Sequence, residues 1–129
     1  MRKNISTKIL SLFFLSVSFS AFSNSLQIDS IIFKHTSFDF GEVKQGAEVR
    51  HLFSFENNTD FMVVIKDVVV QCGCTASNYS KEIIGSGDNS NLEISFNSEG
   101  KYGQIRKNIR VVFSNGQETK LTILAYIVD

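Results

Sequence analysis

The chain has 129 residues, of which 43% are hydrophobic, with 13 basic and 13 acidic side chains, two cysteines and no proline. Without a net positive charge it lacks the electrostatic footprint of a nucleic-acid-binding protein, so we expect no nucleic acid as a partner. Two cysteines are too few for a small fold that depends on several disulfides, so the fold must depend on its apolar core.

The first 23 residues have the order of a secretory signal peptide. Three basic residues precede an apolar run over 9–22, and small residues follow. Ala21 and Ser23 suit the −3 and −1 positions, which predicts cleavage after Ser23, with Ser25 as the second choice. The run is shorter than the roughly 20 apolar residues of a membrane span, so we expect no stable membrane insertion after cleavage. The product is an exported, periplasmic or extracellular domain over 24–129, with ten basic and 13 acidic residues.

Residues 24–129 suit a single domain, and their hydrophobicity has a period of two almost throughout. Strict alternation of apolar and polar residues occurs in four segments: 47–56, 92–96, 105–113 and 121–127. Alternation of this kind predicts half-buried β-strands. Between the first two segments, 61–70 is nearly continuously apolar but is interrupted at Lys66 and Asp67, which predicts a bulge or a break between two strands.

Turn residues separate these segments. They cluster in five places: 41–46, 57–60, 85–89, 99–103 and 114–116. In the last cluster, Ser114, Asn115 and Gly116 predict a type I′ hairpin, in which both central residues take positive φ. Strands at this spacing, without a convincing amphipathic helix, predict an all-β fold: an immunoglobulin-like antiparallel β-sandwich of about seven strands.

Several motifs occur in an order that is similar to a known family. They are Phe-Asp-Phe-Gly-Glu-Val at 38–43, Phe-Ser-Phe-Glu-Asn at 53–57, Cys-Gly-Cys-Thr at 72–75 and Leu-Glu-Ile-Ser-Phe at 92–96. Together they resemble the exported bacterial domain of unknown function 1573, and the cysteine motif is the most specific part. The resemblance implies an immunoglobulin-type sandwich in an exported protein. It implies no activity.

Cys72 and Cys74 are the most distinctive chemical feature of the chain. If 68–74 continues as one strand, both thiols lie on the same face with Cα atoms about 6.6 Å apart, near the upper limit for a disulfide. A disulfide across so short a loop constrains the unfolded chain by only about 1.6 kcal/mol. We therefore expect such a disulfide to contribute little to the stability of the fold and to be easily reduced.

Four interpretations of Cys72 and Cys74 remain open. They can be small core residues beside a turn, a labile dithiol that exchanges with other exported thiols, or one half of an intermolecular bridge. They can also bind copper(I), or zinc if further donors such as His35 and His51 lie nearby. No basic residue adjoins the pair to activate a thiolate, and the first that follows it in the sequence is Lys81.

The remaining polar residues suggest no catalytic site. With only two histidines, no Ser-His-Asp arrangement can be argued, and His51 lies on the apolar face of its segment, as core histidines do. A small basic cluster at Arg106, Lys107 and Arg110 is typical of a solvated strand face.

We therefore expect an exported, non-enzymatic module without a cofactor that binds or assembles with another protein. An exposed sheet edge or the loops at one end of the sandwich would provide the contact. The alternative is a thiol-based redox or copper(I)-handling protein that uses Cys72 and Cys74.

Overall fold

The computed structural model describes Ser18, Ser20 and residues 29–129. The predicted signal peptide over 1–23, with its cleavage after Ser23, lies outside the described residues apart from these two serines. The described residues form strands, turns and loops. No helix long and apolar enough to cross a membrane occurs among them.

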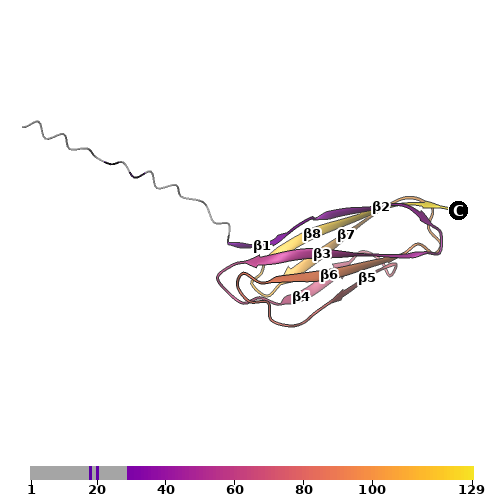
Figure 1. Ribbon diagram of the computed structural model, residues 1–129. Helices are drawn as coiled ribbons and strands as arrows, with labels where there is room; N and C mark the ends of the chain where they lie inside the picture. Colours follow the sequence, from indigo (N-terminus) through magenta and orange to yellow (C-terminus); the bar gives the residue numbers. More distant parts are fainter. Residues whose placement is uncertain (1–17, 19, 21–28) are drawn as a thin grey trace, which may run out of the picture.

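Eight strands form the two sheets of a sandwich (Figure 1). They are β1 (Ser30–Phe33), β2 (Ser37–Lys44), β3 (Glu48–Asn58), β4 (Ile65–Val70), β5 (Thr75–Tyr79), β6 (Asn89–Asn97), β7 (Gly103–Phe113) and β8 (Glu118–Val128). One sheet has the strand order β1-β3-β6-β5, and the other has the order β2-β8-β7-β4. The all-β, immunoglobulin-like prediction is confirmed, with eight strands where about seven were expected.

The apolar residues of the alternating segments meet between the two sheets. Phe53 and Phe96 from one sheet and Phe113 from the other are each 1% exposed. The rings of Phe55 and Phe113 contact each other across the sheets, with centroids 5.4 Å apart. Each fully buried side chain of this kind contributes about 1.5–3 kcal/mol, so packing is the main source of stability.

The N-terminal segment contributes one strand to each sheet. β1 pairs antiparallel with β3, and β2 pairs in parallel with β8. The crossing between them is held on both sides, because Lys34 N–H donates to Ser54 O at 2.9 Å and Thr122 N–H donates to Thr36 O at 2.8 Å. This change of sheet accounts for the eighth strand and for a parallel pair within an otherwise antiparallel sandwich.

Two local predictions have different outcomes. The interruption within 61–70 is a bulge, since the pairing of β4 with β7 shifts its register between Ile65 and Asp67. The β7–β8 hairpin is present, but its prediction as type I′ is wrong. Gly116 has a φ of 90°, whereas every described residue with positive φ is a glycine, so Asn115 does not take the required conformation. An ordinary turn that ends in a left-handed glycine serves instead.

One buried amide holds the end of the sandwich where β3 finishes. The side chain of Asn57 is fully buried, and its Nδ2 donates to the main-chain oxygens of Phe61, Ile84 and Gly85 at 2.8, 3.0 and 3.1 Å. Its Oδ1 accepts from the N–H and the hydroxyl of Thr59 at 3.1 and 2.7 Å. Asn57 thereby ties the β3–β4 connection to the β5–β6 connection.

Candidate functional site

Cys72 and Cys74 lie in the turn that carries the chain from β4 in one sheet to β5 in the other. Their sulfurs form a disulfide, and their Cα atoms are 5.3 Å apart. The expectation of one strand over 68–74 is wrong, because β4 ends at Val70. A hydrogen bond of 3.2 Å from Thr75 N–H to Cys72 O closes the turn and brings the two Cα atoms closer than a strand would.

The two sulfurs share a buried hydroxyl. Thr75 is 3% exposed, and its Oγ1 lies 3.8 Å from Cys72 Sγ and 3.9 Å from Cys74 Sγ. A disulfide sulfur carries no proton, so the hydroxyl, with its single proton, is the only possible donor between it and the two sulfurs. Cys74 also packs against the apolar core, while Gly73 between the cysteines is exposed.

The structure does not bring the histidines to the cysteines. His35 lies between β1 and β2, and His51 lies on β3, whereas the cysteine turn joins the strands at the other side of both sheets. Among the described residues, no group of three or more histidine, cysteine, aspartate or glutamate side chains could hold a metal ion. Within the part of the chain that the structure describes, no third protein ligand for copper(I) or zinc lies beside Cys72 and Cys74.

His51 belongs to an aromatic cluster. Its ring stacks on Phe38 with centroids 3.6 Å apart and meets Phe53 edge-on at 4.8 Å. Burial, and to a lesser extent repulsion by His35, lowers the pKa of His51 below its ordinary value of 6.5. The imidazole is half-buried, as its place on the apolar face of the segment predicted.

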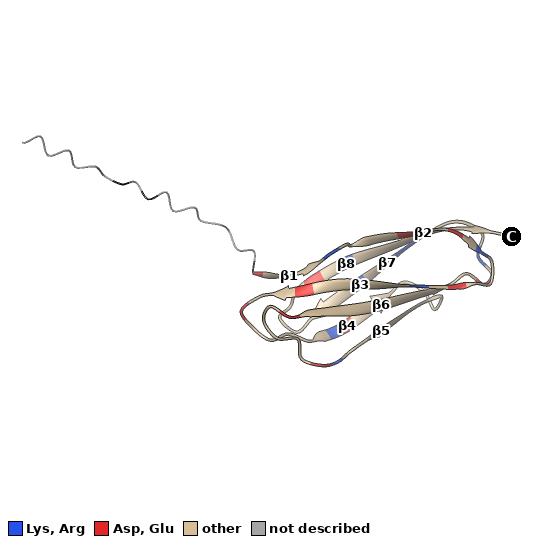
Figure 2. Cartoon of the chain, viewed as in Figure 1, with Lys and Arg blue, Asp and Glu red and all other residues tan. Residues whose placement is uncertain are grey.

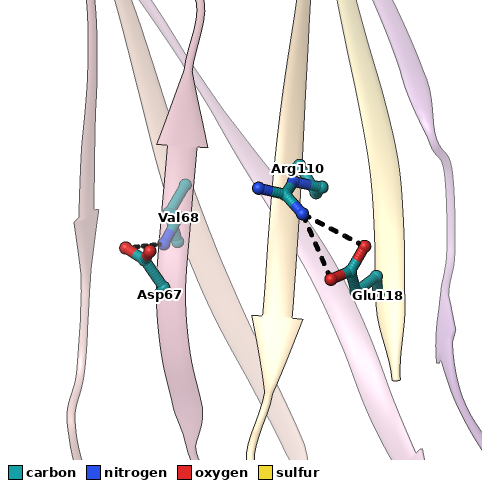
Figure 3. Close-up of polar contacts among 4 residues, drawn as sticks. All are labelled: Asp67, Val68, Arg110 and Glu118. Carbon is teal, nitrogen blue, oxygen red and sulfur yellow. Dashed lines mark hydrogen bonds and ion pairs between the residues drawn. The ribbon is translucent and has the colours of Figure 1, made fainter. Parts of the chain in front are cut away.

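The basic cluster on β7 is partly neutralised. Arg110 Nη1 lies 3.2 and 3.4 Å from the two carboxylate oxygens of Glu118 on β8 (Figure 3). About half of each side chain is exposed, and such a pair contributes only about 0–1 kcal/mol. Acidic and basic residues are interspersed over the strands and connections (Figure 2). Arg106 and Arg110 are exposed on one face of β7, as a solvated strand face requires, whereas Lys107 is half-buried on the opposite face.

On the outer edges of β1 and β2, side chains form hydrogen bonds with main-chain groups. Gln117 closes the edge of β1, because its Oε1 accepts from Ile31 N–H and its Nε2 donates to Ile31 O, both at 2.8 Å. This amide takes the place of a neighbouring strand. On β2, a bulge between Asp39 and Glu42 interrupts the ladder, and Asp39 Oδ1 accepts from Gly41 N–H at 2.8 Å.

The edge of β4 is protected by its own residues. The Val68 N–H points away from β7, as the alternation of the antiparallel ladder requires. Asp67 Oδ1 accepts this hydrogen bond at 2.8 Å (Figure 3). The bulge and the exposed charge of Lys66 lie on the same edge. Bulges and charged side chains are common means by which proteins prevent an edge strand from pairing with another chain.

β5 has none of these protecting features. Asn97 N–H donates to Cys74 O at 2.8 Å, so the ladder with β6 directs the main-chain groups of Ser77 and Tyr79 outward. The pairing of β5 with β6 has no bulge, and the strand has no charged residue. Within 29–129, no side chain or further strand is hydrogen-bonded to these outward groups. β5 therefore presents an open edge.

Exposed apolar side chains form a second feature, at the end of the sandwich held by Asn57. Phe61, Met62 and Ile83 are 71, 70 and 65% exposed. They lie on two connections that are joined by an isolated bridge between Val63 and Ile84. The sequence pattern assigned Phe61 and Met62 to a strand, but they precede β4.

Thr75 belonged to the Cys-Gly-Cys-Thr motif without a role of its own, and the pattern of the sequence did not single out Ser77 or Gln117. For Thr75 and Ser77 a signal was present, since 75–79 lacks charge and Thr75 follows the cysteines directly. For Gln117 there was none, because it acts on a residue 86 positions away.

Three solved structures illustrate the fold. A protein of unknown function from Porphyromonas gingivalis W83 has a TM-score of 0.64 at 14% identity, over 75% of this chain and 46% of its own. The PapD-like domain 7 of human CEP192 has a TM-score of 0.62 at 10% identity, over 78% and 87%. The CupB2 chaperone of Pseudomonas aeruginosa has a TM-score of 0.59 at 8% identity, over 74% and 55%. Identities this low show the fold alone.

The chain spans less than half of the Porphyromonas protein, and it spans 32% of the Vibrio cholerae protease VesB, whose structure is also similar. No curated protein matches the sequence. The family resemblance is confirmed independently of the structures. Residues 31–127 match the family described as protein of unknown function (DUF1573), and the chain belongs to that family.

Proposed function

We propose that this chain is an exported, non-enzymatic module that binds an extended segment of another protein along the open edge of β5. The signal-peptide pattern over 1–23 supports export, because it would direct the domain out of the cytoplasm. The chaperone among the structures of similar fold is in keeping with a polypeptide ligand.

The observation that carries the proposal is the contrast among the four sheet edges. The edges of β1, β2 and β4 each have a side chain that occupies main-chain groups, but β5 leaves those of Ser77 and Tyr79 free for a partner. Unprotected edges promote aggregation, so the edge that lacks a capping side chain, a bulge and a charge is the one best suited to accept a partner strand. Strand addition to such an edge is a common mode of peptide recognition.

The surroundings of β5 indicate the chemistry of the partner. The five residues of β5 extend about 17 Å, which suits a short extended segment. Figure 1 shows that β4 and β5 lie at the same side of the sandwich. Val68, Val70 and Tyr79 are half-buried residues of β4 and β5 that pack against the core. Every second side chain of an added strand would point toward them. We therefore expect a segment with apolar residues at alternate positions.

A pair of substitutions at one position tests this mode of binding. Proline at Ser77 removes an outward N–H without removing a bond to β6, whereas alanine at Ser77 keeps that N–H. The probe is a fluorescent peptide of about seven residues that alternates valine and threonine, which is long enough to cover β5. We expect Ser77→Ala to bind it as the parent does, and Ser77→Pro to bind at least about tenfold more weakly.

Two controls decide between this edge and other surfaces. Phe61→Ser alters the exposed apolar end and is expected to leave peptide binding unchanged. Circular dichroism verifies that Ser77→Pro remains a folded β-protein. Equal binding by Ser77→Pro and Ser77→Ala would overturn the proposal. Dimerisation of the parent that Ser77→Pro abolishes would show instead that the occupant is a second copy of this chain.

A further inference from the structure

We propose that the disulfide between Cys72 and Cys74 is a redox centre that exchanges with a dithiol of another molecule. This activity does not depend on the binding of a strand to β5. It rests on three features of the turn: the disulfide contributes little to the fold, Cys72 lies outside the core cluster while Cys74 packs against it, and the hydroxyl of the buried Thr75 lies near both sulfurs.

The disulfide can open without loss of the fold. It joins two residues of the same turn and links no distant elements, since only Gly73 separates the cysteines. Closing so small a loop constrains the unfolded chain by about 1.6 kcal/mol. The buried core between the sheets, with Phe53, Phe96 and Phe113, includes neither cysteine, and only Cys74 packs against it from the turn. Stabilisation of the fold therefore does not explain why the chain has this disulfide.

The two sulfurs differ in their surroundings. Both cysteines are half-buried, but Cys74 packs against the apolar core, whereas Cys72 lies outside the core cluster. Gly73 has no side chain to cover its neighbours, and the space next to its Cα is open. An incoming thiolate can therefore reach Cys72 Sγ more easily than Cys74 Sγ, which makes the sulfur of Cys74 the leaving group.

Thr75 is placed to stabilise that leaving group. Its hydroxyl is buried and lies 3.9 Å from Cys74 Sγ and 3.8 Å from Cys72 Sγ. When the disulfide opens, the same O–H can donate to the thiolate that is released. A hydrogen bond to the charged form favours it, and a better leaving thiolate speeds exchange. Thr75 is thus a positioning residue for the exchange.

The exchange proceeds in two steps. A thiolate of the partner dithiol attacks Cys72 Sγ, a mixed disulfide forms, and the bond to Cys74 Sγ breaks with the electron pair on that sulfur. The partner's second thiolate then attacks the partner sulfur of the mixed disulfide and releases Cys72. Two electrons and two protons pass from the partner to the cysteines, and the partner becomes a disulfide.

The test measures exchange in the folded, exported protein. The oxidised protein is mixed with millimolar dithiothreitol as the dithiol, or with glutathione as a monothiol, and free thiols are trapped by alkylation and counted by mass spectrometry. We expect dithiothreitol to reduce the pair while the circular-dichroism spectrum remains that of a β-protein. We expect glutathione to react more slowly, because it has no second thiol to resolve the mixed disulfide.

Substitutions of Thr75 separate an exchange role from a structural one. Thr75→Val has nearly the same shape without the hydroxyl, and it is expected to slow reduction about three- to tenfold. Thr75→Ser retains the hydroxyl and is expected to react at the parental rate. A disulfide that resists dithiothreitol until the protein is unfolded by urea would overturn the proposal. Equal rates for the parent and a folded Thr75→Val would overturn the role of Thr75.

Discussion

The buried amide of Asn57 allows a quantitative test of how the sandwich is held at one end. Asn57→Ala removes a donor group that serves three main-chain oxygens and an acceptor that serves Thr59. Each lost hydrogen bond costs about 0.5–1.5 kcal/mol, and more where a buried group stays unpaired. For the five hydrogen bonds the sum is about 2.5–7.5 kcal/mol, a large part of a typical stability of about 5–15 kcal/mol.

Urea denaturation followed by circular dichroism measures this loss, and the denaturant slope should not change. Asn57→Asp is the sharper variant, since it keeps the acceptor for Thr59 but turns a carboxylate toward the oxygens of Phe61, Ile84 and Gly85. We expect it to destabilise at least as much as alanine. Asn78→Ala, on the exposed face of β5, is the matched control and should change stability by less than about 0.5 kcal/mol. A loss below about 1 kcal/mol for Asn57→Ala would refute this reasoning.

Three further predictions concern the leader, the disulfide and His51. Mass spectrometry of the exported protein should give a mature chain that begins at Asn24, and an intact N-terminus would contradict cleavage after Ser23. The double substitution Cys72→Ser and Cys74→Ser should lower the free energy of unfolding by no more than about 1.6 kcal/mol. A much larger loss would show that the disulfide has a structural role. Because the pKa of His51 is lowered in the fold, its unfolded form binds protons more readily. Stability should therefore fall as the pH drops below about 6.5, and His51→Gln should flatten that dependence.

The sandwich itself could be predicted because its information is local. Segments such as 92–96 and 121–127 alternate so regularly that the face toward the core is determined residue by residue. The structure buries Leu92, Ile94 and Phe96 as this alternation requires. The irregularity in β4 could also be predicted from the sequence. Lys66 and Asp67 are two consecutive charged residues within an apolar run, which a regular buried strand does not contain.

Other features could not be predicted because they depend on contacts between distant residues. The N-terminal segment divides between two sheets only because Ser54 and Thr122 offer it partners on both sides of the crossing. The cysteine turn looked like the end of a strand, since Val68, Val70, Cys72 and Cys74 continue the period of two. Local periodicity does not show that the chain must leave one sheet after Val70 to reach the other.

To recognise the open edge of β5, one needs both the local sequence pattern and the contacts between distant residues. The absence of charge over 75–79 is visible in the sequence, but an uncharged strand in the centre of a sheet would have no special meaning. Its meaning comes from the strand order, which places β5 at an edge, and from Gln117, Asp39 and Asp67, which cap main-chain groups on the other three edges. Two of these caps act on neighbours in the sequence, so similar caps can be sought in related chains without a structure. If those chains keep the caps while 75–79 stays uncharged, the bare edge is a selected feature; charge on that edge in the relatives would remove the reason to regard it as a binding surface.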